Sequence, residues 1–314
     1  PVRGRAETGK VAVGEEFAHD GVERADVAEL KLLAFEDLRV MAHGKEMDGN
    51  GSIDPEGRSF GPGLLHNEGQ FMKAQLFVTC LGENLLPDVL QKMVMLLERL
   101  GVECGFPEEQ TCCGQPFFNT GFQSQGKEMA LKWIDAFADT EGPIVAPSGS
   151  CVEFVKHRYP LMFDTGTRER ERAAAVAARV MEISQFLVNV LKVTDVGAVF
   201  PHRVACHYPC HLTRGLGVRG EPEALLRAVK GVQWVPLNEA DTCCGFGGIF
   251  SVVYPEVSKK MMEAKLRNVE ACGAEAVVVS EPGCLINIRG GLKKINSKVK
   301  AMHLIEVLAE GGKA

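Results

Sequence analysis

The feature that most constrains this chain is a four-residue stretch that occurs twice, as Thr111-Cys112-Cys113-Gly114 and as Thr242-Cys243-Cys244-Gly245. A single cysteine lies well before each stretch and another well after it. Each half therefore carries the same set of four: Cys80, Cys112, Cys113 and Cys151 in the first half, and Cys210, Cys243, Cys244 and Cys284 in the second. Matched cysteines are 130 to 133 residues apart. Because this period is far longer than a solenoid repeat, it predicts a duplicated domain.

Composition places the chain among globular proteins with room for two domains, since 46% of its 314 residues are hydrophobic and 24% are charged. A net charge of -6 argues against nucleic acid as a partner. The longest apolar runs, such as the one at residues 276–279, have the length of a strand, so no membrane span is expected. We find no secretory signal. Eleven cysteines in a predicted cytoplasmic protein indicate metal or redox chemistry over disulfides.

Residues 1–71 stand outside the repeat and contain no cysteine. They are rich in glycine and charge, with one helical pattern near residues 26–41, so we expect a poorly ordered extension and regard Met72 as a candidate natural start. A segment from Glu46 resembles a calcium loop. It has Gly57 where the loop needs a bidentate glutamate, so calcium is not favoured.

From residue 73 onward, strand and helix patterns alternate in the same order in both halves. Strands are expected at residues 75–79, 102–106, 144–146, 203–208, 232–237 and 276–280, and helices at 87–100, 123–138, 168–180, 184–191, 222–229, 255–271 and 302–308. This order predicts an α/β fold of two tandem, pseudo-repeated Rossmann-like domains with mostly parallel sheets, at residues 72–197 and 198–314. Sites on such sheets lie beyond the carboxyl ends of the strands, where the cysteines are expected to meet.

Four converging thiolates fit either a tetrahedral zinc site or an iron–sulfur cluster, because both take soft sulfur ligands. Glycine after each cysteine pair, at Gly114 and Gly245, allows a tight turn that brings backbone N–H groups close to sulfur. The wide spacing matches neither zinc knuckles nor ferredoxin runs. The spacing therefore leaves the metal open, and inert buried cysteines remain the structural alternative.

Four motifs resemble those of the cysteine-rich CCG-domain iron–sulfur proteins. They are Phe77-Val78-Thr79-Cys80-Leu81, Phe106-Pro107-Glu108-Glu109-Gln110-Thr111-Cys112-Cys113-Gly114-Gln115-Pro116, His207-Tyr208-Pro209-Cys210-His211-Leu212 and Thr242-Cys243-Cys244-Gly245-Phe246-Gly247-Gly248. The resemblance covers residues 72–308. It implies two clusters, of 4Fe-4S type, held by the eight repeated cysteines, with zinc an alternative in one half. It also implies an oxidoreductase subunit that transfers electrons, working only with partner iron–sulfur subunits in cytoplasmic oxidation of L-lactate to pyruvate.

The chain departs from the five-cysteine pattern of the family's reductase members, which end each half with Cys-x2-Cys. Ser148 and Glu281 occupy the first of those two positions. This departure favours one ordinary cluster in each half. Three other functions stay open: a heterodisulfide-reductase-like subunit, a glycolate-oxidase-like iron–sulfur subunit, and a zinc-stabilised assembly module.

Two histidines lie near the second cysteine set and are candidates to support it. His207 and His211 are expected to form hydrogen bonds to cluster sulfur or to accept protons near it, unless backbone groups satisfy them. Cys206 fits the second half's spacing less well than Cys210, so we interpret it as a strand residue. Cys104 and Cys272 have no counterpart in the other half and are expected to be packed or loop residues.

Overall fold

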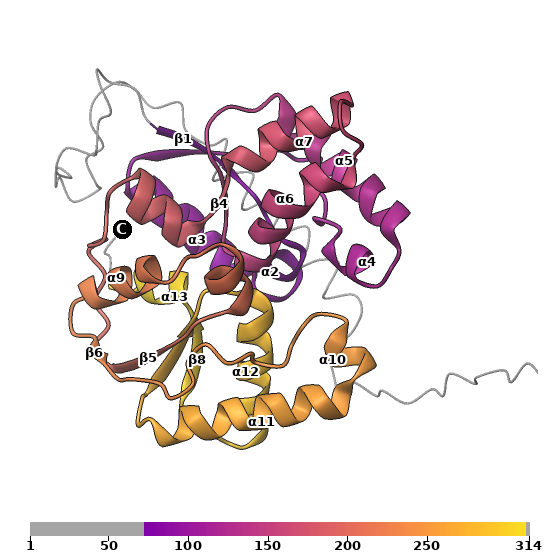
Figure 1. The fold of residues 1–314 in the computed structure, drawn as a ribbon. Coiled ribbons are helices and arrows are strands. Elements are labelled where there is room, and N and C mark those ends of the chain that lie inside the picture. Colours follow the sequence, from indigo (N-terminus) through magenta and orange to yellow (C-terminus); the bar gives the residue numbers. More distant parts are fainter. Residues whose placement is uncertain (1–71, 312–314) are drawn as a thin grey trace, which may run out of the picture.

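Two four-stranded sheets form the framework of the protein, one in each half of the chain (Figure 1). The structure is a computed structural model that describes residues 72–311. The first sheet has the strand order β2 (Val102–Gly105), β1 (Met72–Leu76), β3 (Ile144–Ala146), β4 (Val180–Glu182), and the second has β6 (Gln233–Trp234), β5 (Arg203–His207), β7 (Ala276–Val279), β8 (Lys300–His303). All neighbouring strands are parallel. The predicted α/β fold with parallel sheets is confirmed. The predicted extension, with its calcium-like loop, lies outside the described residues.

The helices follow the same order in both halves, except that the first half has one more helix before its last strand. The first half contains α2 (Cys80–Leu85), α3 (Pro87–Arg99), α4 (Gln115–Asn119), α5 (Gln123–Ala138), α6 (Gly149–Met162), α7 (Arg168–Arg179), α8 (Ile183–Gln185) and the π-helical turn η1 (Phe186–Val190). The second contains η2 (His211–Gly215), another π-helical turn, then α9 (Gly220–Ala228), α10 (Phe250–Val253), α11 (Pro255–Ala271), α12 (Pro282–Lys294) and α13 (Leu304–Ala309). Both α5 and α11 begin and end at the predicted residues.

Several elements beside the cysteines differ from the sequence-based expectation. Helices α6 and α12 were not predicted, because serine, proline and glycine at their starts are also typical of loops. Strand β4 lies mostly in the gap between the helices predicted at 168–180 and 184–191, and the second half of β8 falls inside the helix predicted at 302–308. Each strand is only three or four residues long. Cys80 does not end a strand but begins α2, after a short link from β1. Along the chain, the strand is therefore followed by a short link and then by a helix that begins at the cysteine.

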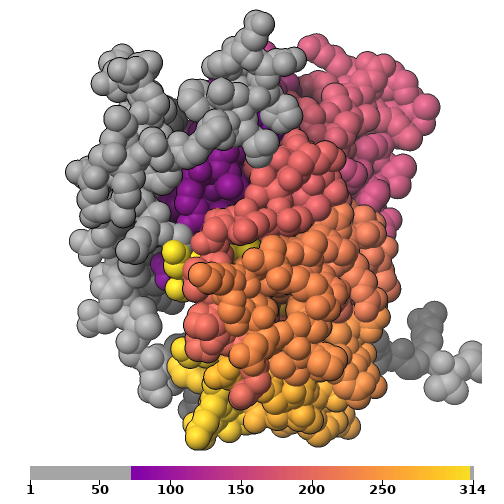
Figure 2. Space-filling view, turned by 90° about the vertical axis from the view of Figure 1, so that its left-hand side faces the viewer, coloured from indigo at the N-terminus to yellow at the C-terminus, as the bar shows by residue number. Residues whose placement is uncertain are grey.

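A helix near the end of each half packs against the other half. In the described chain α13 of the second half packs on α3 of the first, and α8 of the first half packs on α9 of the second. Figure 2 shows the matching neighbourhood on one face, where yellow residues near the carboxyl end lie beside indigo residues. One hydrophobic core accordingly contains Leu90 of α3, Leu225 of α9 and Leu304 of α13. The predicted boundary at residues 197 and 198 stays a prediction, because the halves share this core.

A second core belongs to the first half and is built from aromatic rings. Trp133 of α5 stacks on Phe137 with ring centroids 4.3 Å apart, and Phe77 meets the same indole edge-on at 4.9 Å. Tyr159 of α6 closes the cluster on the other side of Trp133 at 5.6 Å. These four side chains are fully buried. Large buried rings stabilise such a cluster by removing apolar area from water and by edge-to-face contacts.

The last strand of each half ends in a buried polar residue that caps the following helix. Glu182 ends β4 and accepts hydrogen bonds from the backbone N–H of Ser184 at 2.7 Å and from the Ser184 hydroxyl. His303 ends β8, and its Nδ1 accepts from the backbone N–H of Ile305 at 3.2 Å. Burial raises the pKa of Glu182 to about 8 and lowers that of His303 to about 4. Both side chains are therefore favoured in their neutral forms.

Replacing Glu182 with glutamine is expected to flatten the pH dependence of stability. The folded pKa of about 8 lies above the ordinary value of 4.5, so the folded protein holds a proton that the unfolded chain releases between those values. The wild type should therefore lose stability relative to Glu182→Gln as the pH rises through this window, by about 1.4 kcal/mol for each unit of raised pKa. Urea unfolding at pH 5 and at pH 8 measures the difference, and parallel curves for the two proteins would contradict it.

Candidate metal centres

The structure brings the eight repeated cysteines together in two groups of four. In the first group, side-chain hydrogen bonds link Cys80 to Cys112, Cys112 to Cys113, and Cys113 to Cys151. The second group repeats the chain of contacts, from Cys210 through Cys243 and Cys244 to Cys284. The measured Sγ–Sγ separations are 3.6 Å for Cys80 and Cys112 and 3.0 Å for Cys244 and Cys284. Residues far apart in sequence thus offer four sulfur donors to each of two small volumes.

Helix starts place the outer cysteines of each group. Cys80 is the first residue of α2, whose cap Thr79 accepts from the N–H of Gly82 at 3.3 Å. Cys151 lies in the first turn of α6, capped by Ser148, and Cys284 lies in the first turn of α12. The positive end of a helix dipole favours negative charge on a nearby sulfur. The fold therefore directs these cysteines toward positions that suit thiolates.

The glycine after each cysteine pair has a conformation that other residues rarely adopt. Gly114 has φ +82° and Gly245 has φ +88°. A Cβ on Gly245 would lie 2.6 Å from the carbonyl oxygen of Ser258, and one on Gly114 would lie 3.0 Å from that of Gly126. Only glycine avoids both the strain and the clash with the following helix. This conformation also lets the N–H of Gly245 donate to Sγ of Cys243 at 3.4 Å and the N–H of Phe246 donate to Sγ of Cys244 at 3.5 Å.

Hydrogen bonds within each group separate its thiols into acceptors and donors. Hydrogen bonds with Cys113 and Cys80 lower the pKa of Cys112 to about 3, and those with Cys210 and Cys244 lower the pKa of Cys243 to about 2. These contacts favour the charged form of the first cysteine in each pair. The donor thiols have raised pKa values, because their hydrogen bonds stabilise the protonated form and burial penalises the charge.

The donor sets fit a soft metal centre, which binds thiolate sulfur. Each group holds four sulfurs linked by successive contacts, and backbone N–H groups stand near sulfur in the second. Two further side chains, which the sequence analysis did not identify, hold the backbone of the cysteine pairs. The Tyr159 hydroxyl donates to the carbonyl of Cys113, and the Asn287 amide donates to that of Cys244, both at 2.9 Å. Neither residue stands at an equivalent position of the repeat, so no repeated signal marked them.

Ser148 and Glu281, the two departures from the five-cysteine pattern, face each other across the halves. The buried Glu281 carboxylate accepts from the hydroxyl of Ser148 at 3.2 Å, and from the hydroxyl and N–H of Ser150 at 2.9 and 2.7 Å. Burial raises the pKa of Glu281. Beside this contact, Nε2 of His303 lies 3.0 Å from the Pro147 carbonyl, to which it donates. Two helix starts, each carrying a cysteine, are thereby held together.

The two predicted supporting histidines have different surroundings. His211 is half-exposed, and its Nδ1 lies 3.2 Å from the carboxylate of Glu153 in the other half. His207 is buried, and its Nδ1 lies 2.9 Å from the Ala240 carbonyl. Burial, with the nearby Lys265 ammonium, lowers the pKa of His207 to about 3. A ring nitrogen of His207 lies within 4.8 Å of the sulfurs of Cys244 and Cys284, so only His207 joins the second group.

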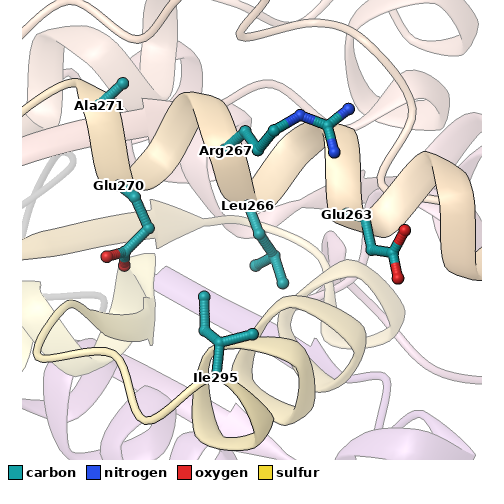
Figure 3. Close-up of a pocket in the computed structure, with 6 residues that line it drawn as sticks. All are labelled: Glu263, Leu266, Arg267, Glu270, Ala271 and Ile295. Atoms are coloured by element: carbon teal, nitrogen blue, oxygen red, sulfur yellow. The ribbon is translucent and has the colours of Figure 1, made fainter.

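The remaining cysteines and a surface cavity lie outside these groups. Cys206 and Cys104 are core residues whose pKa values burial raises to about 12, and Cys272 ends α11. A cavity of about 490 Å³ opens between the carboxyl-terminal part of α11 and Ile295, with Leu266 and Ile295 on its apolar floor (Figure 3). None of the eight repeated cysteines lines it. The cavity is therefore not part of either candidate centre.

Comparison with known proteins agrees with the repeated motifs. The family described as Cysteine-rich domain (CCG) matches residues 74–156 and 204–289. Lactate utilization protein A of an Exiguobacterium species is 47% identical over 76% of this chain and 97% of its own length. The proteins of that name from Geobacillus thermodenitrificans and Bacillus subtilis are 45% and 44% identical, over 76% of this chain and 98% and 99% of their own lengths.

The chain belongs to the cysteine-rich CCG-domain family, and the resemblance inferred from its motifs is confirmed. Among solved structures, an aspartate racemase homologue from Pyrococcus horikoshii OT3 is 11% identical, with a TM-score of 0.30 over 76% of this chain and 96% of its own. That likeness is too weak to bear on the site. Within residues 72–311, no helix combines the length and apolar character needed to cross a bilayer.

Replacing Glu281 with alanine is expected to destabilise the protein by about 1–3 kcal/mol, because it leaves the buried donors of Ser148 and Ser150 without an acceptor. Urea unfolding midpoints measure the loss. Glu263→Ala, at an exposed position of α11, serves as the matched control and should stay within about 0.5 kcal/mol of wild type. Equal stability of the two variants would show that the Glu281 contact does not hold the halves together.

Proposed function

We propose that this chain is an iron–sulfur electron-transfer subunit of a multi-protein complex that oxidises L-lactate to pyruvate. The observation that carries the proposal is the pair of four-cysteine groups, in a chain whose relatives named Lactate utilization protein A match along nearly their whole length. The thiol groups support the metal, and the relatives' name supports the pathway. The eight cysteines are the proposed ligands, four in each half.

An iron–sulfur cluster, when bound, supplies one-electron transfer. The chain's own residues supply the holding and tuning of each centre. The lowered pKa values of Cys112 and Cys243 favour thiolate ligands, while helix starts orient the outer cysteines. Backbone N–H groups of Gly245 and Phe246 point at sulfur, which stabilises negative charge there. Buried surroundings of Cys113 and Cys244 keep water from the inner side of each centre.

The heterodisulfide-reductase-like alternative has less support, because its extra ligand positions are filled by Ser148 and Glu281, which bond to each other. The glycolate-oxidase-like alternative would use the same electron-transfer chemistry on another substrate. A zinc-stabilised module has one specific observation in its favour, the buried grouping of His207 with Cys244 and Cys284. Metal analysis separates it from the leading proposal.

Apolar side chains exposed beside the second centre support docking of a partner iron–sulfur subunit. Val252, Val253 and Tyr254 are 71%, 56% and 58% exposed, on α10 and at the start of α11. They lie between the Cys243-Cys244 turn and the body of α11, and Phe122 is similarly exposed after the first pair. Electron transfer between subunits needs a close approach to the centre. A mostly apolar partner surface fits this patch, because exposed apolar side chains in a cluster mark interaction sites.

The Cys112→Ser variant is expected to keep about half of the iron. Each group has its own complete set of donors, and serine keeps the shape of cysteine but is a poor soft-metal ligand. Iron, sulfide and zinc content with EPR of anaerobically purified protein should show two clusters in the wild type and one in the variant. Stoichiometric zinc without iron in the wild type would contradict the proposed function.

Loss of all iron from Cys112→Ser would instead mean that the eight cysteines build one shared centre. The variant's urea unfolding midpoint is the control for folding. Activity of the reconstituted complex should fall severely even when the fold survives, since an electron chain fails at a missing member. A purely structural metal would show the opposite pattern, with stability lost first.

Replacing both Val252 and Val253 with aspartate is expected to weaken assembly with the partner iron–sulfur subunits while iron content stays at the wild-type level. Two carboxylates in the apolar patch would have to be desolvated on docking. Co-purification of the complex from cells that express all subunits measures assembly. Val199→Asp, at another exposed valine, is the control. Unchanged assembly of the double variant would place the partner's docking surface elsewhere.

A further inference from the structure

The imidazole of His207 has one nitrogen whose role the fold explains and one whose role it does not. Nδ1 lies 2.9 Å from the carbonyl oxygen of Ala240. A carbonyl can only accept, so Nδ1 must carry the hydrogen, and in the neutral ring Nε2 is then a bare lone pair. Nε2 is fully buried and has no hydrogen-bond partner. A buried polar atom without a partner is rare and points to a missing ion or ligand.

The sulfur atoms of two cysteines lie close to this ring. A ring nitrogen of His207 and the Sγ atoms of Cys244 and Cys284 all lie within 4.8 Å of one another, and the three residues are buried. The two sulfurs are 3.0 Å apart. In this tautomer Nε2 cannot donate a hydrogen bond to sulfur. It can, however, donate its lone pair to a metal ion, and a ligating histidine usually binds a backbone carbonyl through its other nitrogen, as His207 does.

The first half provides an internal comparison. Register on the central strands and contacts at the glycine turns pair His207 with Phe77, and Lys265 with Trp133. In the first half these two positions form an apolar edge-to-face ring pair. In the second half they are polar, and the Lys265 ammonium donates to the carbonyls of Glu239 and Ala240. The duplicated fold does not itself need a histidine here, because Phe77 fills the same place.

We propose that Nε2 of His207 is a direct metal ligand of the second centre, alongside Cys244 and Cys284, whereas the first centre has thiol ligands alone. One of Cys243 and Cys210, which stand next in the same chain of contacts, completes the set of four ligands, and His207 takes the place of the other. Imidazole suits both iron and zinc, so the ion is an iron of the proposed cluster or a zinc ion. The assignment to iron rests on the proposed function; the assignment of the nitrogen ligand does not.

A nitrogen ligand would make the two centres chemically unequal. Where a neutral imidazole replaces a thiolate, the bound centre carries less negative charge, and histidine ligation is known to raise the reduction potential of iron–sulfur centres. Electrons would then run from the all-thiol first centre to the second. The exposed apolar patch beside the second centre would face the subunit that receives them.

X-ray absorption at the iron and zinc edges of the anaerobically purified full chain tests the ligand directly. The expected result is a nitrogen scatterer at about 2.0–2.1 Å together with sulfur at about 2.3 Å. Pulsed EPR of reduced protein containing isotopically labelled histidine should show the coupling of a bound nitrogen. In His207→Phe, which copies the first half, that nitrogen signal should vanish and metal affinity of the second centre should fall at least about tenfold.

His157→Phe, at an exposed position of α6, is the matched control and should keep the nitrogen signal. Sulfur alone around iron in the wild type, with two clusters present, would overturn the nitrogen ligand and leave the proposed function standing. Nitrogen and sulfur around zinc, with no iron, would support the nitrogen ligand and overturn the proposed function. No metal in the second half, or a nitrogen signal that survives in His207→Phe, would also overturn it. Because the wild-type spectrum is decisive, a failure of His207→Phe to fold does not affect the test.

Discussion

The carboxylate of Glu281 is buried where the two halves meet, and the relative placement of the two cysteine groups depends on it. It caps α12 and also accepts the hydrogen bonds of Ser148 and Ser150 at the start of α6. Cys284 and Cys151 lie in the first turns of those same helices. Without this contact, two positive helix ends and several buried donors would face each other unpaired. A carboxylate at the junction therefore fixes the separation of the two centres.

The same contact accounts for the departure from the five-cysteine pattern. The position three residues before each late cysteine is a helix cap that points across the interface, so a side chain there can serve either a metal or the junction. In this chain, serine and glutamate bond to each other. The exchange of α8 and α13 between the halves reinforces the junction with a shared apolar core. The two cysteine groups are thus held on halves that share one apolar core.

Duplication preserved the framework and let the surroundings of the two groups diverge. Strand order, glycine turns and helix starts are the same in both halves. The space behind the cysteine pair differs, because it is filled by the Phe77 and Trp133 rings in one half and by His207 and Lys265 in the other. A buried cation and an imidazole change the charge around the second group, while aromatic rings isolate the first. Two centres with different properties can therefore be built on one repeated fold.

The sequence by itself determined the duplication, the parallel α/β class, the eight converging cysteines and the two glycine turns. Each of these leaves a local or periodic mark: repeated spacing, apolar runs such as the one in β7, and glycine where φ must be positive. Tertiary structure alone decided that Ser148 meets Glu281, that Tyr159 and Asn287 hold the pairs, and that the buried His207 ring lies near Cys244 and Cys284. Tertiary structure also decided that α6 and α12 form where the sequence indicates loops, and that β4 and β8 form as strands of three and four residues. These outcomes depend on partners more than a hundred residues away, or on packing that satisfies buried polar atoms, and neither is visible in a local pattern.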